Sequence, residues 1–94
     1  MYKLVVTPSG KRSLKKLPYG VRKDLLKAAS VLEMNPYAGE KLSGSLHFLY
    51  SFHFKSGNVD YRLAYTVEQN QKLVIVHFGH TRENFYDKLR RLFQ

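Results

Sequence analysis

The sequence predicts an α+β fold in which an antiparallel sheet is covered on one face by an N-terminal helical hairpin. Two observations support this prediction. Apolar residues in the first third of the chain recur at the three- and four-residue spacing of amphipathic helices, whereas the remainder alternates in runs separated by turn signals. With 94 residues, the chain is expected to form one domain, residues 1–94, with the element order β-α-α-β-β-β-α.

A short strand and two helices are expected first. Residues 2–6 are rich in β-formers and predict a strand. Thr7 suits the N-cap of a helix over residues 8–17, in which a proline takes the first position and a second proline follows the end. A longer helix is expected over residues 21–34, where one apolar stripe is present and Asn35-Pro36 ends it. The two helices form the hairpin.

Three strands and a helix are expected in the second half. Strands over residues 48–54 and 60–68 flank a Ser-Gly-Asn turn, and a third strand covers residues 72–78. That strand is expected to break at Gly79, and a basic helix follows over about residues 84–93. Strands joined by short turns pair antiparallel, and the first strand is expected to join the same sheet.

Charge is the strongest signal in the composition. Sixteen Lys and Arg residues oppose seven Asp and Glu residues, giving a net charge of +9. Because a magnitude of about 2–8 is enough for solubility, this charge indicates a polyanionic partner such as RNA, DNA or an acidic protein. The absence of cysteine excludes disulfides and thiolate zinc sites. No apolar run approaches the roughly 20 residues of a membrane span, so a soluble cytoplasmic protein without membrane contact is expected.

Strand alternation is expected to gather polar side chains on one face. In the strand over residues 48–54, the side that carries Phe48 is expected to face the core, while Ser51, His53 and Lys55 face the other way. In the next strand, Arg62 points away from its tyrosine neighbours and toward that same open face. The convergence depends on the hairpin register, since a slip of one residue reverses it.

A second polar set follows Gly79. His80 and Arg82 come directly after it, and Tyr86 follows Arg82 by four residues, the spacing that places two side chains on one side of a helix. Together the two sets hold two arginines, two histidines and a tyrosine without an acidic pair. Carboxylate-based metal chemistry and a glycosidase pair are therefore not expected, and neither is a cofactor.

These residue types suit cleavage of RNA without a metal ion. Attack by a ribose 2′-hydroxyl needs a base, cations that hold the pentavalent phosphate, and an acid for the leaving oxygen. A histidine with a pKa near neutrality can act as base or acid. The planar fork of arginine meets phosphate oxygens in pairs, and a tyrosine can transfer a proton or stack on a base.

Three stretches resemble the RelE toxins, within the RelE/ParE superfamily of type II toxin–antitoxin systems. Residues 42–52 resemble the family's Leu-x-Gly segment and the strand after it, residues 60–65 its Tyr-Arg-x-x-Tyr strand, and residues 79–86 its closing segment from Arg to Tyr. The resemblance implies the RelE-like microbial RNase fold and a ribosome-dependent mRNA endonuclease that acts in the ribosomal A site. It also implies 2′-hydroxyl attack that leaves a cyclic phosphate, and an inhibitory, acidic cognate antitoxin.

The resemblance also implies roles for individual residues. Arg62 matches the strand arginine that clamps phosphate, Arg82 matches the arginine that stabilises the phosphorane, and Tyr86 matches the tyrosine that stacks on or activates the nucleotide. The chain departs from the RelE pattern at Ser51 and His53, where RelE has two lysines. We infer that His53 is the general base.

The remaining assignments are broader. His80 can share the role of Arg82, because the spacing after the glycine varies within the family. Basic or polar side chains near these sets are expected to contact RNA: Lys15, Lys16, Ser51 and Lys55. Two alternatives stay open, a ParE-like toxin that inhibits DNA gyrase without RNase activity and a non-catalytic nucleic-acid-binding protein.

Overall fold

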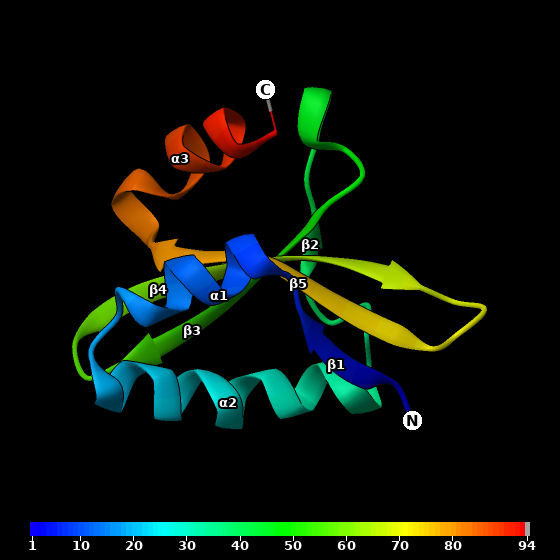
Figure 1. Ribbon diagram of the computed structural model, residues 1–94, viewed down its shortest axis with the longest axis horizontal. Coiled ribbons are helices and arrows are strands. Elements are labelled where there is room, and N and C mark those ends of the chain that lie inside the picture. Colours follow the sequence, from blue (N-terminus) through cyan, green and yellow to red (C-terminus); the bar gives the residue numbers. More distant parts are fainter. Residues whose placement is uncertain (94) are drawn as a thin grey trace.

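The computed structural model describes residues 1–93, which form a five-stranded sheet with three α-helices (Figure 1). The α+β class is thereby confirmed, and a two-residue strand that was not predicted, β2, is added to the order. Among the helices of residues 1–93, none has the length and apolar character to cross a membrane. The elements in chain order are β1 (Lys3–Val6), α1 (Pro8–Lys15), α2 (Tyr19–Met34), β2 (Glu40–Lys41), a 3₁₀ turn (Gly44–Leu46), β3 (Tyr50–Ser56), β4 (Val59–Glu68), β5 (Leu73–Thr81), a 3₁₀ turn (Arg82–Asn84) and α3 (Phe85–Leu92).

The strands lie in the order β1-β5-β4-β3-β2. β3, β4 and β5 pair antiparallel, as predicted, and the unpredicted β2 pairs antiparallel with β3. β1 instead runs parallel to β5, with Lys3 opposite Leu73 and Val6 opposite Val76. Because α1, α2 and three strands separate β1 from β5 along the chain, no short hairpin dictates their relative direction. The sheet is therefore mixed at one edge.

The two faces of the sheet carry separate hydrophobic cores. The hairpin of α1 and α2 covers one face, as predicted, while α3 lies across the other (Figure 1). Buried residues of the first core include Leu25, Leu32, Leu63, Tyr65 and Val74. Buried residues of the second core are Leu46, Leu49, Ala64, Phe85 and Leu89. The second face is only partly covered, and it is the face on which polar side chains are exposed.

α1 covers the half of β5 that β1 leaves unpaired. The Ser9 hydroxyl donates to the carbonyl oxygen of His77 at 3.1 Å, and the backbone N–H of Gly79 donates to the Ser13 hydroxyl at 3.1 Å. A Cβ atom at Gly10 would lie 2.7 Å from a carbonyl oxygen of β5, so the close approach of the helix requires glycine there. The helix thus satisfies backbone groups that an exposed edge strand would leave free.

β5 does not break at Gly79, contrary to the prediction. The strand continues to Thr81, and a Cβ atom at Gly79 would lie 2.7 Å from Cδ2 of Leu14. Glycine is needed here because α1 packs closely against the strand, which is one of the known reasons for glycine inside a strand. His80 consequently belongs to β5, and its direction is fixed by the sheet.

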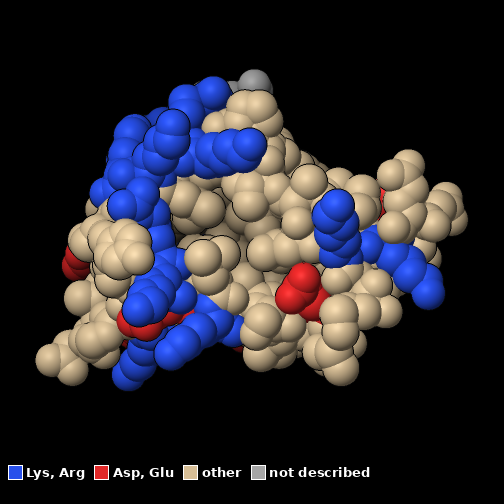
Figure 2. Space-filling view, turned by 60° about the horizontal axis from the view of Figure 1, so that its bottom comes forward, with Lys and Arg blue, Asp and Glu red and all other residues tan. Residues whose placement is uncertain are grey.

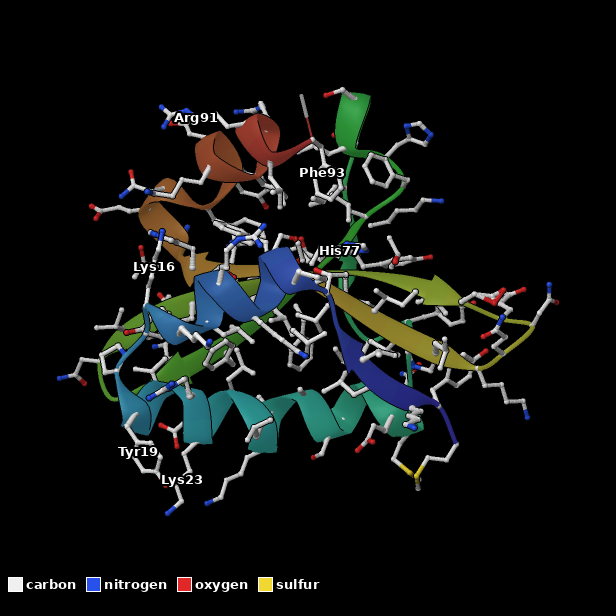
Figure 3. The ribbon with its side chains drawn as sticks, viewed as in Figure 1. Lys16, Tyr19, Lys23, His77, Arg91 and Phe93 are labelled. Carbon is white, nitrogen blue, oxygen red and sulfur yellow. The ribbon has the colours of Figure 1, made fainter. Side chains whose placement is uncertain are left out.

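The prediction that Phe48 faces the core with the aromatic residues of β3 is wrong. β3 begins only at Tyr50, after the 3₁₀ turn Gly44–Leu46. The Phe48 side chain is exposed, and its ring meets the edge of the Phe93 ring at a centroid distance of 5.2 Å. Phe93 also contacts His77, at 5.7 Å between ring centroids (Figure 3). The end of α3 is therefore held over the sheet by aromatic contacts.

Candidate active site

Three neighbouring strands place three of the candidate residues in one row. Arg62 of β4 lies opposite His53 of β3 on one side and opposite His80 of β5 on the other. Side chains of directly opposed residues in a sheet point to the same face. The sequence predicted that polar side chains of these strands share a face only if the hairpin had the right register. The structure has that register, and Arg62 lies between His53 and His80.

Two hydroxyl groups hold the guanidinium of Arg62. Its Nη1 donates to the Tyr86 hydroxyl at 3.1 Å and, over a longer 3.5 Å, to the Ser51 hydroxyl. The Cζ atom also lies 5.6 Å from the centre of the Tyr86 ring. The Nε of Arg62 is buried and finds no acceptor within residues 1–93. A charged donor held in this way can bind an oxyanion without first losing much conformational freedom.

Ser51 is fully buried, with 0% of its surface exposed. The direct contact with RNA expected from the sequence is therefore contradicted by its burial. Its hydroxyl instead lies beneath Arg62 and helps to hold the guanidinium.

The start of α3 orients Tyr86. Phe85 and Leu89 are fully buried in the second core and anchor the helix on the sheet. Tyr86 follows Phe85 directly, with the two rings edge to face at 5.1 Å. This anchoring directs the Tyr86 ring over the sheet, where its hydroxyl reaches Arg62.

His80 is partly buried against an aromatic ring. Its imidazole stacks on Phe78 with ring centroids 5.8 Å apart, and its Nδ1 lies 3.1 Å from Oγ1 of Thr81. Burial lowers the pKa of His80, a hydrogen bond with the backbone of Thr81 opposes that shift, and the charges of Lys88 and Lys16 lower the pKa further. The neutral imidazole, which can accept a proton, is favoured.

His53 is exposed and faces an acidic residue that sequence reasoning missed. Its Nε2 lies 3.6 Å from Oε1 of Glu40, which can pair with the protonated imidazole. Glu40 reaches this place because β2 pairs with β3, with Glu40 opposite Ser51. A strand of two residues has no periodicity that could be detected in the sequence. Only the pairing of β2 with β3 would have indicated that Glu40 lies near His53.

Arg82 lies apart from the bond between Arg62 and Tyr86. It begins the 3₁₀ turn, and its Nη1 is 4.0 Å from Oδ2 of Asp60, with both side chains largely exposed. The four-residue spacing would place Arg82 and Tyr86 on one side of a helix only if the helix had begun by Arg82, and α3 begins at Phe85. Such an exposed pair leaves the guanidinium of Arg82 available to another anion.

A cavity of about 690 Å³ joins Arg62, Arg82 and Tyr86, and the acidic residues Asp60 and Glu83 share its lining. We call it the first cavity. Within residues 1–93 no group of three or more His, Cys, Asp or Glu residues is arranged to hold a metal ion. What the first cavity offers a ligand is two guanidinium groups and an aromatic ring.

Of the lysines expected to contact RNA, Lys16 and Lys55 lie near residues of the site, and Lys15 lies next to Lys16. Lys16 caps the end of α1, and its charge reaches His80 (Figure 3). Lys15 lies in the last turn of α1, and Lys55 lies opposite Asp60 in the pairing of β3 with β4. Figure 2 shows Lys and Arg side chains gathered along the side of the molecule where α3 and the end of α1 lie. The site therefore opens beside a strongly basic surface.

The fold is that of the toxins in bacterial and archaeal toxin–antitoxin complexes. The chain matches the toxin–antitoxin complex RelBE2 from Mycobacterium tuberculosis with a TM-score of 0.77 and 24% identity, over 86% of this chain and 98% of that chain. It matches the intact E. coli RelBE complex with a TM-score of 0.71 and 23% identity, over 88% and 99%. The isolated E. coli RelE toxin gives a TM-score of 0.69 and 25% identity, over 98% and 99%.

The family model that matches residues 4–90 describes the ParE-like toxin of type II bacterial toxin–antitoxin systems. The chain belongs to this family of toxins. The resemblance to the RelE/ParE superfamily predicted from three short stretches is confirmed. A search of curated proteins finds no match to the chain.

Proposed function

We propose that this toxin is a ribosome-dependent endoribonuclease that cleaves mRNA by 2′-hydroxyl attack, without a metal ion, and so stops translation. The row in which Arg62 stands between His53 and His80, under the Tyr86 hydroxyl, is the observation that supports the proposal most strongly. It offers a cation for the phosphate with a possible base on one side and a possible acid on the other.

The row suits an in-line displacement. Two strand spacings of about 4.8 Å separate the backbones of His53 and His80 by roughly 10 Å, so a phosphate held at Arg62 lies between the two imidazoles. One histidine takes the 2′-hydroxyl proton as the 2′-oxygen attacks phosphorus. The bond to the 5′-oxygen of the next nucleotide breaks, and the other histidine gives that oxygen a proton. The products are a 2′,3′-cyclic phosphate and a free 5′-hydroxyl.

We assign the base to His80 rather than to His53, which was inferred from the sequence. Burial lowers the pKa of His80 and so favours the neutral imidazole, and the contact with Thr81 uses only Nδ1. His53 lies beside the carboxylate of Glu40, which suits an imidazole that carries and releases a proton. General acid and base catalysis each contribute roughly 10²–10⁴ in rate.

The two arginines and Tyr86 stabilise the transition state. Arg62 offers the part of its guanidinium that lines the first cavity, and Arg82 offers its exposed guanidinium, to the oxygens of the phosphorane. Donors positioned in this way are worth on the order of 10²–10³ in rate each. Tyr86 presents its ring to a nucleotide base and fixes Arg62 until the substrate arrives.

The proposed partners are the ribosome with its mRNA and an acidic cognate antitoxin in the cytoplasm. The solved relatives include toxins in complex with antitoxins. The net charge of +9 favours association with an acidic chain and with RNA alike.

Arg82→Ala tests the proposal. Because Arg82 is exposed and begins a surface turn, we expect the variant to keep its circular dichroism spectrum while losing cleavage of mRNA by about 10²–10³ in a translating extract. Lys72→Ala removes an exposed cation at the far end of β5 and serves as the control. Intact transcripts after addition of the unaltered protein to the extract contradict the proposal.

Inhibition of DNA gyrase is the second candidate, and the ParE-like family model favours it. A supercoiling assay with purified gyrase distinguishes the two. Loss of supercoiling with intact mRNA supports the gyrase inhibitor, whereas cleaved mRNA with normal supercoiling supports the endoribonuclease. RNA binding with neither effect supports a non-catalytic binding protein.

A further inference from the structure

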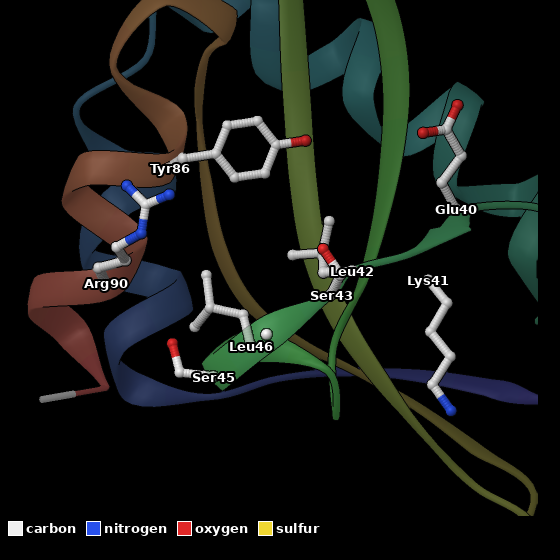
Figure 4. Close-up of a pocket in the computed structure, with 9 residues that line it drawn as sticks. Glu40, Lys41, Leu42, Ser43, Ser45, Leu46, Tyr86 and Arg90 are labelled. Atoms are coloured by element: carbon white, nitrogen blue, oxygen red, sulfur yellow. The ribbon is translucent and has the colours of Figure 1, made fainter.

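Tyr86 lines two cavities. On one side lies the first cavity, with Arg62 and Arg82. On the other side lies a second cavity of about 570 Å³, lined by residues 40–46, Tyr86 and Arg90 (Figure 4). The cleavage mechanism uses Tyr86 and Glu40 from this lining and gives the other residues of the second cavity no role.

The lining of the second cavity has the groups that a nucleotide needs. The Tyr86 ring and the side chains of Leu42 and Leu46 offer aromatic and apolar surface to a base. Arg90 offers a guanidinium to a phosphate. The carboxylate of Glu40 comes from the opposite wall (Figure 4). Lys41 of β2 also lines the cavity, so cations are present on both of its walls.

Backbone hydrogen bonds brace the loop that forms one wall of the second cavity. Backbone N–H groups of Leu42, His47 and Leu49 donate to carbonyl oxygens within the same loop at 3.0–3.2 Å. Gly44 turns the loop with a φ of +66°, which a side chain would disfavour. On the other wall, Nη1 of Arg90 lies 3.2 Å from Oδ1 of Asp87, and this exposed pair leaves the guanidinium of Arg90 available to a phosphate. The braced loop lowers the entropy cost of binding.

We propose that the second cavity is a nucleotide subsite, occupied by the residue of single-stranded RNA next to the one in the first cavity. This inference rests on the proposed cleavage of RNA. Because the two cavities share Tyr86, one strand can pass over that ring and place consecutive nucleotides on its two sides. Arg90 holds the phosphate in the second cavity.

The test uses a 2′-O-methylated RNA trinucleotide, which lacks the attacking hydroxyl and reports binding without cleavage. We expect Arg90→Gln to weaken its binding about tenfold, the loss of about 1.4 kcal/mol for one charge-assisted contact. Arg91→Gln is the matched control, because the neighbouring arginine does not line the cavity and points away from the sheet (Figure 3). It removes the same charge, and we expect a change of no more than about twofold.

Amide chemical shifts locate the ligand. Shifts of Gly44 and Ser45 on addition of the trinucleotide are expected if the second cavity is occupied. The inference is overturned by equal effects of Arg90→Gln and Arg91→Gln, by unmoved amides in residues 43–46, or by failure of the unaltered protein to bind. Cleavage in the translating extract is scored separately. If the extract shows cleavage but the loop amides do not shift, the subsite is contradicted and the proposed reaction is not. If the amides shift but no cleavage occurs, the proposed reaction is contradicted and the binding site is not.

Discussion

At the residue scale, the histidine assigned as base determines how cleavage depends on pH. Burial lowers the pKa of His80 below its ordinary value near 6.5, and only the neutral imidazole accepts a proton. Single-turnover cleavage is therefore expected to rise with pH through the His80 pKa and to level off before neutrality. His80→Gln is expected to remove this rise and to lower the rate at neutral pH by about 10²–10⁴.

Two comparisons test that assignment. His53→Gln is expected to lower the rate but to leave the rise with pH in place, because His80 is still present. If His80→Gln lowers the single-turnover cleavage rate by less than about tenfold, His80 is not the general base. Since a histidine with a lowered folded-state pKa binds protons more readily when unfolded, stability also falls as the pH drops through about 6.5. Circular dichroism at each pH separates unfolding from loss of catalysis.

The sequence predicted most of the residues in the row but not their contacts. Alternation along β3 and β4 was enough to place His53 and Arg62 on one face. The bond between Arg62 and Tyr86 was not predictable, because it depends on how α3 returns over the sheet. Glu40 was missed because a two-residue strand gives no pattern, and only its pairing with β3 brings it near His53.

At the element scale, the docking of α1 on β5 depends on one buried serine. Ser13 accepts a hydrogen bond from the backbone of Gly79 and donates to the carbonyl oxygen of Gly10 at 2.9 Å. Ser13→Ala leaves the buried N–H of Gly79 without its partner, so we expect the free energy of unfolding to fall by about 1–3 kcal/mol. Chemical denaturation measures the change.

Ser30→Ala is the matched control for Ser13→Ala. Ser30 also lies in a helix and donates to a backbone carbonyl of its own helix, that of Lys27, but it is exposed. Its replacement is expected to change stability by less than about 0.5 kcal/mol. Equal losses for the two serines contradict the role of Ser13 as the link between α1 and β5.

The sequence predicted well those elements whose conformation is determined by residues close together in the chain. The apolar stripe of α2 and the turn between β3 and β4 are local patterns, and both elements appear near their predicted bounds. The predicted break at Gly79 failed because that glycine has a tertiary cause, the approach of Leu14 from α1. The parallel pairing of β1 with β5 also depends on contacts between distant parts of the chain, so no local sequence pattern predicts it.

At the scale of the whole molecule, the placement of positive charge matters more than its total. The net charge of +9 attracts any polyanion. Lysines and arginines nevertheless gather on the side of the molecule where α3 and the end of α1 lie (Figure 2). Binding of single-stranded RNA is therefore expected to use this side and to release counterions from it, which makes the affinity depend steeply on salt.

The double variant Lys15→Gln/Lys16→Gln tests this placement against a control of equal charge. Lys3→Gln/Lys72→Gln also removes two positive charges, but from the start of β5, eight residues or roughly 26 Å along the strand from His80. Each phosphate contact contributes about 0.7 to the slope of log affinity against log salt for a single strand. Loss of Lys15 and Lys16 is therefore expected to reduce the slope by about 1.4, measured by fluorescence anisotropy with a labelled RNA, while the control pair leaves it nearly unchanged. Equal slopes for the two double variants mean that RNA responds to the total charge, and that the end of α1 is not part of its path to the site.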